Sequence, residues 1–269
     1  MFRIAVIGAG NMGGALARGW ARTFGGGNVI VANPSKGKLD SLKEEFPDIN
    51  VTTDNRVAVD RADVVVLAVK PWKIEGVVGQ LQDLLANSEK LIVSVVAGVT
   101  ADDLSEMIGG SQHRPAVVYC IPNTPVAVGQ GMIFYCGSGI DDHHRALLTE
   151  MFMPLGRSLE VEPRQMGAGM AVASCGIAYA MRYIRAAVEG GVELGLTPAQ
   201  AQEAVMQALV GSVELLRANA THPEQEIDRV TTPGGITIRG LNAMEEAGFS
   251  ASVIKGLQSS KRGFEFKPN

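Results

Sequence analysis

The sequence predicts a doubly wound α/β domain with a mostly parallel β-sheet, followed by an all-α domain. The first half of the chain alternates short β-branched runs with amphipathic stretches, which is typical of successive βαβ units. Residues 64–69 and 91–96 are almost entirely apolar, as expected for strands covered by helices on both faces. After residue 162, strand-like runs give way to long helical patterns rich in Ala, Met and Val.

The first domain is expected to span residues 1–162. Proline at position 71 and a threonine at position 100 mark the starts of two of its helices. The predicted strands are 3–8, 28–32, 64–69, 91–96, 116–121, 132–136 and 158–161. The predicted helices are 12–23, 36–45, 72–85, 101–107 and 141–152.

The second domain is expected to span residues 163–269. One helix runs from about Met166 to Glu193 and stops before Gly195, a residue type suited to the position after a helix end. Thr197 and Pro198 then provide an N-cap and a first-turn proline for a helix that reaches about residue 219. Two further helices are expected to begin near residues 234 and 250.

Composition limits the classes of function. The chain has 269 residues, of which 46% are hydrophobic and 19% are charged, which excludes a disordered chain. A net charge of −4 and the lack of a basic run argue against nucleic acid or an anionic membrane as a partner. We expect no signal peptide, because an apolar strand begins at once, and no stretch is long and apolar enough to cross a bilayer.

The cysteines predict reduced thiols and no metal site. Cys120, Cys136 and Cys175 are widely spaced, form no CxxC pair, and do not combine with the four histidines in a metal-ligand spacing. An odd number of scattered cysteines fits a reducing compartment. We therefore expect a cytoplasmic protein.

A glycine-rich turn at the start of the chain predicts a dinucleotide site. Gly8, Gly10 and Gly13, with Asn11 and Met12 between the last two, form G-x-G-x-x-G between a strand and a helix. Such glycines permit a tight turn, close approach of the backbone to a pyrophosphate, and close strand–helix packing. The amino end of the helix offers N–H groups to the phosphates. Because further βα units follow, we interpret this domain as a Rossmann fold.

The end of the second strand favours NADP over NAD. NAD-specific sites place an acidic residue about twenty positions past the fingerprint, where it accepts hydrogen bonds from the ribose. Here that position is Asn33, with Ser35 and Lys36 just beyond. A carboxylate would repel a 2′-phosphate, whereas an amide, a hydroxyl and an ammonium group would bind one.

Two further turns follow predicted strands at the edge where doubly wound sheets bind ligands. Ala68, Val69, Lys70 and Pro71 end one strand, and we expect them to line the cofactor groove. Asn123 lies in a proline-flanked turn after a later strand, where it could fix a polar group near the nicotinamide. A purely structural turn would have the same pattern.

A second candidate site lies in the helical domain. Thr232, Gly234, Gly235, Ile236 and Thr237 precede or open an amphipathic helix, and the paired glycines leave backbone N–H groups uncovered at its amino end. This arrangement suits an anion such as a carboxylate. An ordinary capped helix would explain the segment equally well. No acid–base pair or nucleophile triad is evident, and hydride transfer from a cofactor requires none.

Together these motifs resemble the pyrroline-5-carboxylate reductase family. Residues 230–249 are similar to the signature of that family, and the glycine-rich turn, Ala68–Pro71 and the Pro122–Pro125 turn with the glycines after it agree in order and spacing. The resemblance covers essentially the whole chain. It implies reduction of the cyclic imino acid 1-pyrroline-5-carboxylate to L-proline with NAD(P)H, the last step of proline biosynthesis.

The resemblance also implies residue roles and an assembly. The substrate carboxylate would rest on Thr232, Gly234, Gly235 and the amides that follow, and Thr237 would be the catalytic residue, hydrogen-bonded to the ring nitrogen. The second domain would form a homodimer through intertwined helices, and some family members build larger rings of dimers.

One segment departs from the family pattern. Where the family usually has Gly-Ser-Gly-Pro-Ala-Tyr, residues 174–179 read Ser-Cys-Gly-Ile-Ala-Tyr. The resemblance places this helix beside the substrate, which makes Cys175 a candidate substrate contact. The changes to Cys175 and Ile177 put substrate preference and rate in doubt more than the fold.

Three alternatives stay open at this point. A β-hydroxyacid dehydrogenase shares the domain order but needs a catalytic lysine on the interdomain helix, and residues 166–194 contain no lysine. A related cyclic imine could be the substrate. A catalytically inactive NADP-binding sensor or scaffold would fit the altered residues 174–179, but the intact segment 232–237 argues against it.

Overall fold

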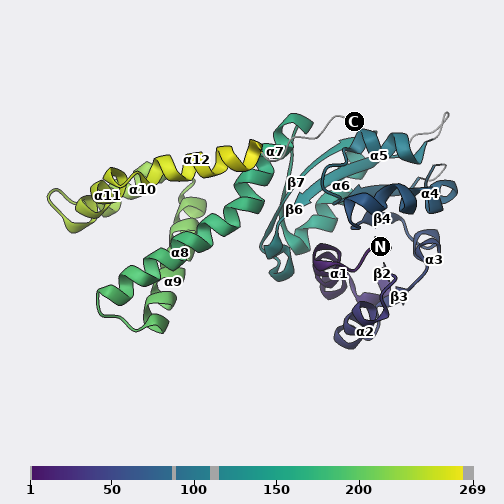
Figure 1. Ribbon diagram of the computed structural model, residues 1–269, viewed down its shortest axis with the longest axis horizontal. Helices are drawn as coiled ribbons and strands as arrows, with labels where there is room; N and C mark the ends of the chain where they lie inside the picture. The colour runs from purple at the N-terminus through teal and green to yellow at the C-terminus, as the bar shows by residue number, and fades with distance from the viewer. Residues whose placement is uncertain (1, 87–88, 110–114, 263–269) are drawn as a thin grey trace. The chain divides into compact units, whose positions relative to one another are not determined.

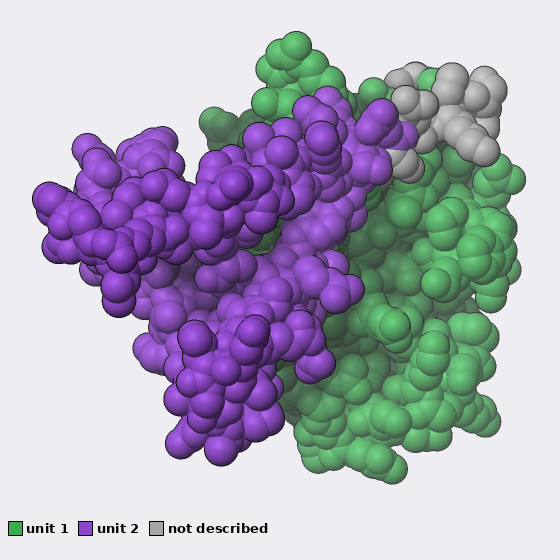
Figure 2. All heavy atoms as spheres, turned by 60° about the vertical axis from the view of Figure 1, so that its left-hand side comes forward, with its two compact units in different colours: residues 1–174, 264–269 green, residues 175–263 purple. Residues whose placement is uncertain are grey.

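The chain folds into two compact units (Figure 2). The computed structural model describes residues 2–86, 89–109 and 115–262. The first unit extends to Ser174, and the second begins at Cys175. Residues 163–174 group with the first unit because Met166 is fully buried in its core and Gly169 packs against the ring of Phe134. The sequence-based boundary at 162/163 stays a prediction.

The first unit contains an eight-stranded sheet with the order β3-β2-β1-β4-β5-β6-β7-β8. Neighbouring strands are parallel except for the antiparallel pair β6 and β7, so the doubly wound, mostly parallel sheet is confirmed. The strands are β1 (Ile4–Ile7), β2 (Val29–Ala32), β3 (Asn50–Thr52), β4 (Val64–Leu67), β5 (Leu91–Ser94), β6 (Val117–Pro122), β7 (Gly131–Ser138) and β8 (Gly156–Glu160).

Helices cover both faces of this sheet (Figure 1). On one face lie α1 (Asn11–Phe24), α2 (Lys36–Glu45) and α6 (Asp142–Phe152). On the other lie α3 (Asn55–Asp60), α4 (Ile74–Leu85) and α5 (Ala101–Ile108). Every residue of β1, β2, β4 and β5 is therefore buried, as the apolar runs predicted. Five 3₁₀ turns complete the described part of this unit: η1 (Gly26–Asn28), η2 (Pro71–Lys73), η3 (Thr124–Val128), η4 (Met153–Leu155) and η5 (Pro163–Gln165).

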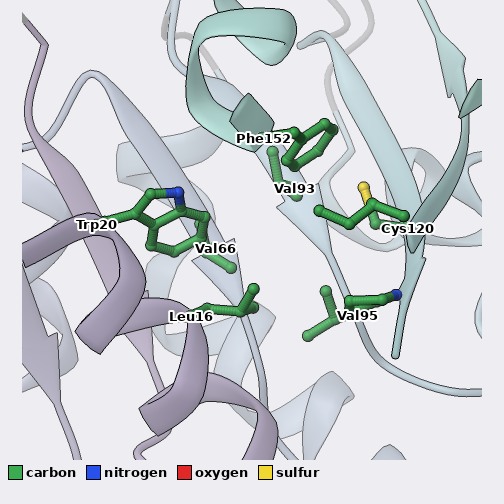
Figure 3. A pocket seen from close by; sticks show the side chains of 9 residues that line it. Leu16, Trp20, Val66, Val93, Val95, Cys120 and Phe152 are labelled. Carbon is green, nitrogen blue, oxygen red and sulfur yellow. The ribbon is translucent and has the colours of Figure 1, made fainter. Parts of the chain in front are cut away.

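The core beneath α1 is closely packed. Trp20 is 1% exposed, and its indole Nε1 donates to the Met151 carbonyl at 2.8 Å. An apolar void of about 10 Å³ remains between this side chain, Phe152 and Cys120 (Figure 3). A void of this size has room for about one water molecule at most. It is a packing defect and not a ligand site.

The second unit is helical. It contains α8 (Gly176–Glu193), α9 (Pro198–Asn219), α10 (Pro223–Val230), α11 (Ile236–Glu246) and α12 (Phe249–Arg262). The predicted N-cap is confirmed, because the Thr197 hydroxyl accepts from the Gln200 N–H in a capping box. Gly195 has φ +100°, which explains why a glycine follows the end of α8. The short helix α10, opened by Pro223, was not predicted.

The predicted single helix over residues 166–193 is interrupted. It consists of α7 (Met166–Gly169), the π-helix η6 (Met170–Cys175) and α8. The buried side chain of Asn123 donates from Nδ2 to the Ala173 carbonyl at 3.2 Å, inside the widened turn. A side chain that takes a carbonyl from the helix ladder is one of the recognised causes of such distortions. The π-helix therefore depends on a partner fifty positions away in the sequence.

In the part of the chain that the structure describes, no helix is both long enough and apolar enough to cross a membrane.

Candidate functional site

The glycine-rich turn has the geometry that a dinucleotide requires. Gly8 ends β1 with φ +109°, and its N–H donates to the Ala32 carbonyl at 2.8 Å. A Cβ on Gly13 would lie 2.0 Å from the Gly8 carbonyl oxygen, so glycine is needed there for close packing of α1 against β1. A Cβ on Gly10 would meet nothing within 4 Å, so its backbone is open to a ligand.

The amino end of α1 is suited to a phosphate. Gly10 is its N-cap, with no side-chain cap and no acidic residue in the first turn. The first N–H groups, including those of Asn11 and Met12, lack carbonyl partners within the helix. Asn11 is exposed, and Met12 and Gly10 are half-buried. Free N–H groups and the helix dipole together favour a bound anion here.

Asn33 has a structural task that the sequence did not reveal. It is 8% exposed, its Oδ1 accepts from the Ala9 N–H at 3.0 Å, and its Nδ2 donates to the Ser35 carbonyl at 3.0 Å. The side chain therefore ties the glycine-rich turn to the loop after β2. Both of these hydrogen bonds use the side-chain amide, so Asn33 positions the nucleotide loops in addition to replacing the expected carboxylate.

The start of α2 remains available to an anion. Ser35 is the N-cap, yet its side chain makes no cap hydrogen bond, and the first turn has no acidic residue. Ser35 and Lys36 are exposed, and the structure gives neither side chain a hydrogen bond or ion pair with another described residue. A hydroxyl, an ammonium group and a helix amino end thus lie together beside the turn held by Asn33.

The loop after β4 closes against the glycine-rich turn. A Cβ on Gly8 would come within 2.6 Å of the Ala68 carbonyl oxygen and 3.3 Å of the Val69 side chain. Ala68 and Val69 are half-buried, whereas Lys70 and Pro71 are exposed. The structure thus brings this predicted segment to the same sheet edge as Gly8–Gly13.

Asn123 lies in the core of its turn. It is 5% exposed, its Oδ1 accepts from the Met132 N–H at 2.8 Å, and its Nδ2 holds the π-helix. The side chain is therefore a tie between β7, η3 and η6. These two bonds fix the orientation of the amide, and a cofactor role for Asn123 stays a prediction.

Residues 174–179, which depart from the family pattern, lie at the end of the π-helix and at the start of α8. The Ser174 hydroxyl oxygen is buried and has no hydrogen-bond partner among the described residues. Cys175 and Ile177 are half-buried. Tyr179, two positions beyond, donates to the Gly256 carbonyl at 3.2 Å and contacts the Ser260 hydroxyl, which ties α8 to α12. π-bulges occur often at functional sites.

The second predicted site is a tight turn followed by a helix in the second unit. The Gly235 N–H donates to the Thr232 carbonyl at 2.9 Å, with Pro233 and Gly234 between them. Gly234 has φ +71°, the left-handed value that such a proline–glycine turn needs. A Cβ on Gly235 would lie 2.4 Å from the Thr232 hydroxyl oxygen, so a glycine is required there as well.

The helix that follows this turn begins without a side-chain cap. Gly235 is the N-cap of α11, which has no side-chain cap and no acidic residue in its first turn. Ile236, 88% exposed, and Thr237, also exposed, begin the helix. The Thr237 hydroxyl has no hydrogen bond to another described residue. The turn therefore offers N–H groups and a free hydroxyl to a small anion.

Two loops at the carboxyl edge of the sheet, after β3 and after β5, were not predicted from the sequence. Asn55 begins α3 directly after β3, a strand too short to give a periodic signal, although the Asp54 N-cap marked the helix start. Ala97 and Gly98 follow β5, and both are exposed. The hydroxyl of buried Tyr119 bonds to the Gly98 backbone, and burial raises its pKa to about 12.

The cysteines differ in their surroundings. Cys120 and Cys136 are buried, and burial raises the pKa of both thiols, that of Cys136 to about 11. Cys175 is half-buried and, like the others, free. Within the described residues, no group of histidine, cysteine, aspartate or glutamate could hold a metal ion.

We expect Cys175 to be the one thiol that reacts rapidly with a thiol reagent in the native protein. Thiolate is the reactive form, and the raised pKa values keep Cys120 and Cys136 protonated at neutral pH. Titration with a chromogenic disulfide should give one fast thiol before unfolding and three after it. A Cys175→Ser variant should lose the fast phase, and two or more fast thiols in the native protein would contradict this interpretation.

Comparisons with known proteins agree with this geometry. A family model described as pyrroline-5-carboxylate reductase dimerisation matches residues 163–265. A second, described as NADP oxidoreductase coenzyme F420-dependent, matches residues 3–98. A pyrroline-5-carboxylate reductase of Synechocystis is 32% identical over 263 residues, covering 97% of this chain and 96% of the relative. Pyrroline-5-carboxylate reductase 1 of Dictyostelium discoideum is also 32% identical, but the chain spans only 48% of its length.

Solved structures are similar over the whole chain. A pyrroline-5-carboxylate reductase from Coxiella burnetii has a TM-score of 0.91 and 29% identity, covering 100% of this chain and 99% of that one. The Plasmodium falciparum reductase with NADP bound has a TM-score of 0.84 and 28% identity, covering 97% and 96%. A 3-hydroxyisobutyrate dehydrogenase from Mycobacterium tuberculosis, with a TM-score of 0.54 and 16% identity, shares the fold alone.

Proposed function

The chain belongs to the pyrroline-5-carboxylate reductase family, and on this premise we propose how its two sites divide the work of the reaction. The protein is an NAD(P)H-dependent oxidoreductase that reduces the C=N bond of 1-pyrroline-5-carboxylate to give L-proline, in proline biosynthesis. The nucleotide lies on the glycine-rich edge of the first unit. The imino acid is held by the turn at Thr232–Gly235 and the start of α11.

The turn before α11 binds the substrate carboxylate. Gly234 and Gly235 carry no side chain that could cover the backbone N–H groups, and α11 has no acidic residue in its first turn. The helix dipole adds a partial positive charge at this end. The N–H groups of Ile236 and Thr237 and the hydroxyl of Thr232 are donors for the two carboxylate oxygens. This uncapped helix start is the observation that carries the proposal.

Thr237 positions and polarises the imine nitrogen. When bound, the nicotinamide supplies a hydride to the imine carbon, and the nitrogen gains a proton, so the products are L-proline and the oxidised cofactor. The Thr237 hydroxyl hydrogen-bonds the ring nitrogen while the charge on that nitrogen changes during the reduction. A fixed hydroxyl stabilises that change without the reorganisation that water would need. Cys175, the last residue of the π-helix, is proposed as a further substrate contact.

The direct test follows NADPH absorbance with pyrroline-5-carboxylate as substrate, with NADH in parallel. Stoichiometric formation of L-proline supports the proposal. If NADPH binds but is not oxidised, the site assignments fail and a binding protein without catalysis becomes the better description. If only a six-membered cyclic imine is reduced, the segment from Ser174 to Ile177 becomes the first place to examine, because it departs from the family pattern.

NADPH is the preferred cofactor, because the residues after β2 offer hydrogen-bond donors and a cation where an NAD-specific site has a carboxylate. Asn33 leaves no negative charge beside the ribose, and the exposed Ser35 hydroxyl and Lys36 ammonium group face solvent at the start of α2. These groups would bind a 2′-phosphate by charge-assisted hydrogen bonds. The family model matched by residues 3–98 names NADP, which supports this choice.

Lys36→Ala is expected to raise the KM for NADPH by about ten- to 150-fold and to leave that for NADH unchanged, because a hydrogen bond to a charged group contributes about 1.5–3 kcal/mol. Steady-state kinetics with both cofactors measure the ratio. Arg61→Ala is the matched control, since Arg61 is an exposed cation at the end of α3, away from the carboxyl edge of the sheet. An equal change for both cofactors would contradict the assignment.

The helical unit is a dimerisation domain through which two chains form a homodimer. The surface of this unit supports the assignment. In α8, α10, α11 and α12 no residue is buried within the single chain, although the helices carry many large apolar side chains. A groove of about 770 Å³ between α8 and α12 is lined largely by apolar residues and includes none of the residues 232–237. A second chain would cover this surface.

Assembly beyond the dimer and cellular location are finer proposals. A ring of dimers would follow the pattern of some family members, and sedimentation would distinguish it from a dimer. A cytoplasmic location fits the three free cysteines. Two of them, Cys120 and Cys136, are buried on the neighbouring strands β6 and β7 and form no disulfide.

A further inference from the structure

Among the described residues of the first unit, Trp72 is the one large aromatic hydrophobic side chain that is exposed. It is 77% exposed, whereas the other tryptophan, Trp20, is 1% exposed in the core. The structure gives the Trp72 side chain no hydrogen bond or ring contact with a described residue. A large aromatic side chain left in water loses the favourable free energy that burial would give it. An exposed tryptophan at a ligand edge is therefore a candidate contact.

Its position is fixed by the local backbone. Trp72 is the middle residue of η2, which begins at Pro71, and the Lys73 N–H donates to the Lys70 carbonyl at 2.9 Å. The ring of Pro71 fixes its own φ, which together with this hydrogen bond holds the backbone of the turn at Trp72. The side chain stands just three positions beyond Val69, which contacts the Gly8 turn.

The surroundings are those of the adenosine half of a dinucleotide. β4 adjoins β1, and β1 adjoins β2, so η2 stands at the same sheet edge as the glycine-rich turn and the Asn33–Lys36 loop. The helices α3 and α4 pack on one sheet face and begin at this edge. Val57, on the first turn of α3, is a large apolar side chain that is 43% exposed. Lys70 and Lys73 belong to the same turn as Trp72, and both are exposed.

We propose that the Trp72 indole stacks on the adenine ring of the bound nucleotide and is a positioning residue for the cofactor. Adenine has a polar edge and apolar faces, and stacking on an aromatic ring is a sequence-tolerant way to hold such a base. The inference rests on the proposed use of a dinucleotide but does not depend on which imine is reduced. Trp72 takes no part in hydride transfer.

The test uses adenosine 2′,5′-bisphosphate, which contains the adenine and the 2′-phosphate but no nicotinamide. Binding should quench tryptophan emission in the wild-type protein, because Trp72 is exposed and Trp20 provides a constant background. Calorimetry should show that Trp72→Ala weakens this ligand by about five- to 150-fold, the range for loss of one base–aromatic stack. Trp72→Phe should restore affinity to within about threefold, because it keeps an aromatic face.

A control and a kinetic readout separate stacking from a structural effect. Leu159→Ala changes another exposed apolar side chain, on the far edge strand β8, and should bind the bisphosphate like the wild type. In Trp72→Ala, the KM for NADPH should rise while kcat at saturating NADPH stays unchanged. Wild-type affinity of Trp72→Ala for the bisphosphate, or binding to the wild type without any change in emission, would overturn the proposal.

The two proposals fail in different ways. If the wild type reduces pyrroline-5-carboxylate and Trp72→Ala binds the bisphosphate normally, only the stacking role fails. If the bisphosphate binds and quenches Trp72 emission but no imine is reduced, the proposed reaction fails and the stacking role stands.

Discussion

Replacing Thr237 by alanine is expected to lower kcat for pyrroline-5-carboxylate reduction by about a hundredfold to a thousandfold, the loss found when one preorganised donor is removed from a reacting centre. Thr237 is exposed in the first turn of α11, and no described residue uses its hydroxyl. The substitution therefore removes the hydroxyl that we propose interacts with the substrate, and it breaks no hydrogen bond to a described residue. Alanine also has the higher helix propensity, so α11 should not be weakened.

The expected kinetic pattern separates this role from simple binding. Thr237→Ala should lower kcat and kcat/KM for the imino acid, whereas the dissociation constant for NADPH should not change, because the nucleotide is assigned to the first unit. Thr237→Ser keeps the hydroxyl and should retain most of the activity. Stopped-flow measurement of hydride transfer gives the chemical step directly. If Thr237→Ala has a wild-type kcat and only a raised KM, the hydroxyl binds substrate without aiding the reaction.

Gly10→Ala is expected to fold normally and to lose about five- to 150-fold in NADPH affinity, since an overpacked contact costs about 1–3 kcal/mol. Gly10 has φ −71° and ψ −172°, values open to any residue, and its Cβ would meet nothing within 4 Å. The free protein therefore has room for the methyl group. The pyrophosphate must approach this backbone closely, so the methyl group would occupy space that the ligand needs.

Gly13→Ala provides the contrasting variant. Its Cβ would lie 2.0 Å from the Gly8 carbonyl oxygen and 2.9 Å from the Ala68 side chain, so the fold itself must shift. Overpacking of this kind costs about 1–3 kcal/mol or more, which thermal unfolding would show as a lower Tm. Calorimetric titration with NADPH and thermal unfolding of both variants complete the test. Equal Tm losses for Gly10→Ala and Gly13→Ala would show that the Gly10 position is structural.

The sequence predicted the parts of this protein that depend on local geometry. The turn at Gly8 and Gly13 could be recognised because positive φ and the lack of space for a Cβ leave glycine as the one suitable residue. Gly234 and Gly235 could be recognised because glycines leave the backbone N–H groups at a helix start uncovered. The apolar run of β4 predicted a strand buried on both faces, and the Thr197–Pro198 pair predicted the start of α9.

Only the tertiary structure decided which polar side chains form hydrogen bonds with residues far away in the sequence. Asn33 reads in the sequence as one of the groups that would bind a 2′-phosphate, and the structure shows that its amide also joins the Ala9 N–H to the Ser35 carbonyl. Asn123 reads as a nicotinamide contact, but it holds the π-helix at Ala173, and the helix pattern over residues 166–193 contains no sign of that interruption. Periodicity and residue type describe what a segment prefers by itself. A hydrogen bond to a carbonyl fifty positions away depends on the packing of the whole unit, so it could be found only after the chain had folded.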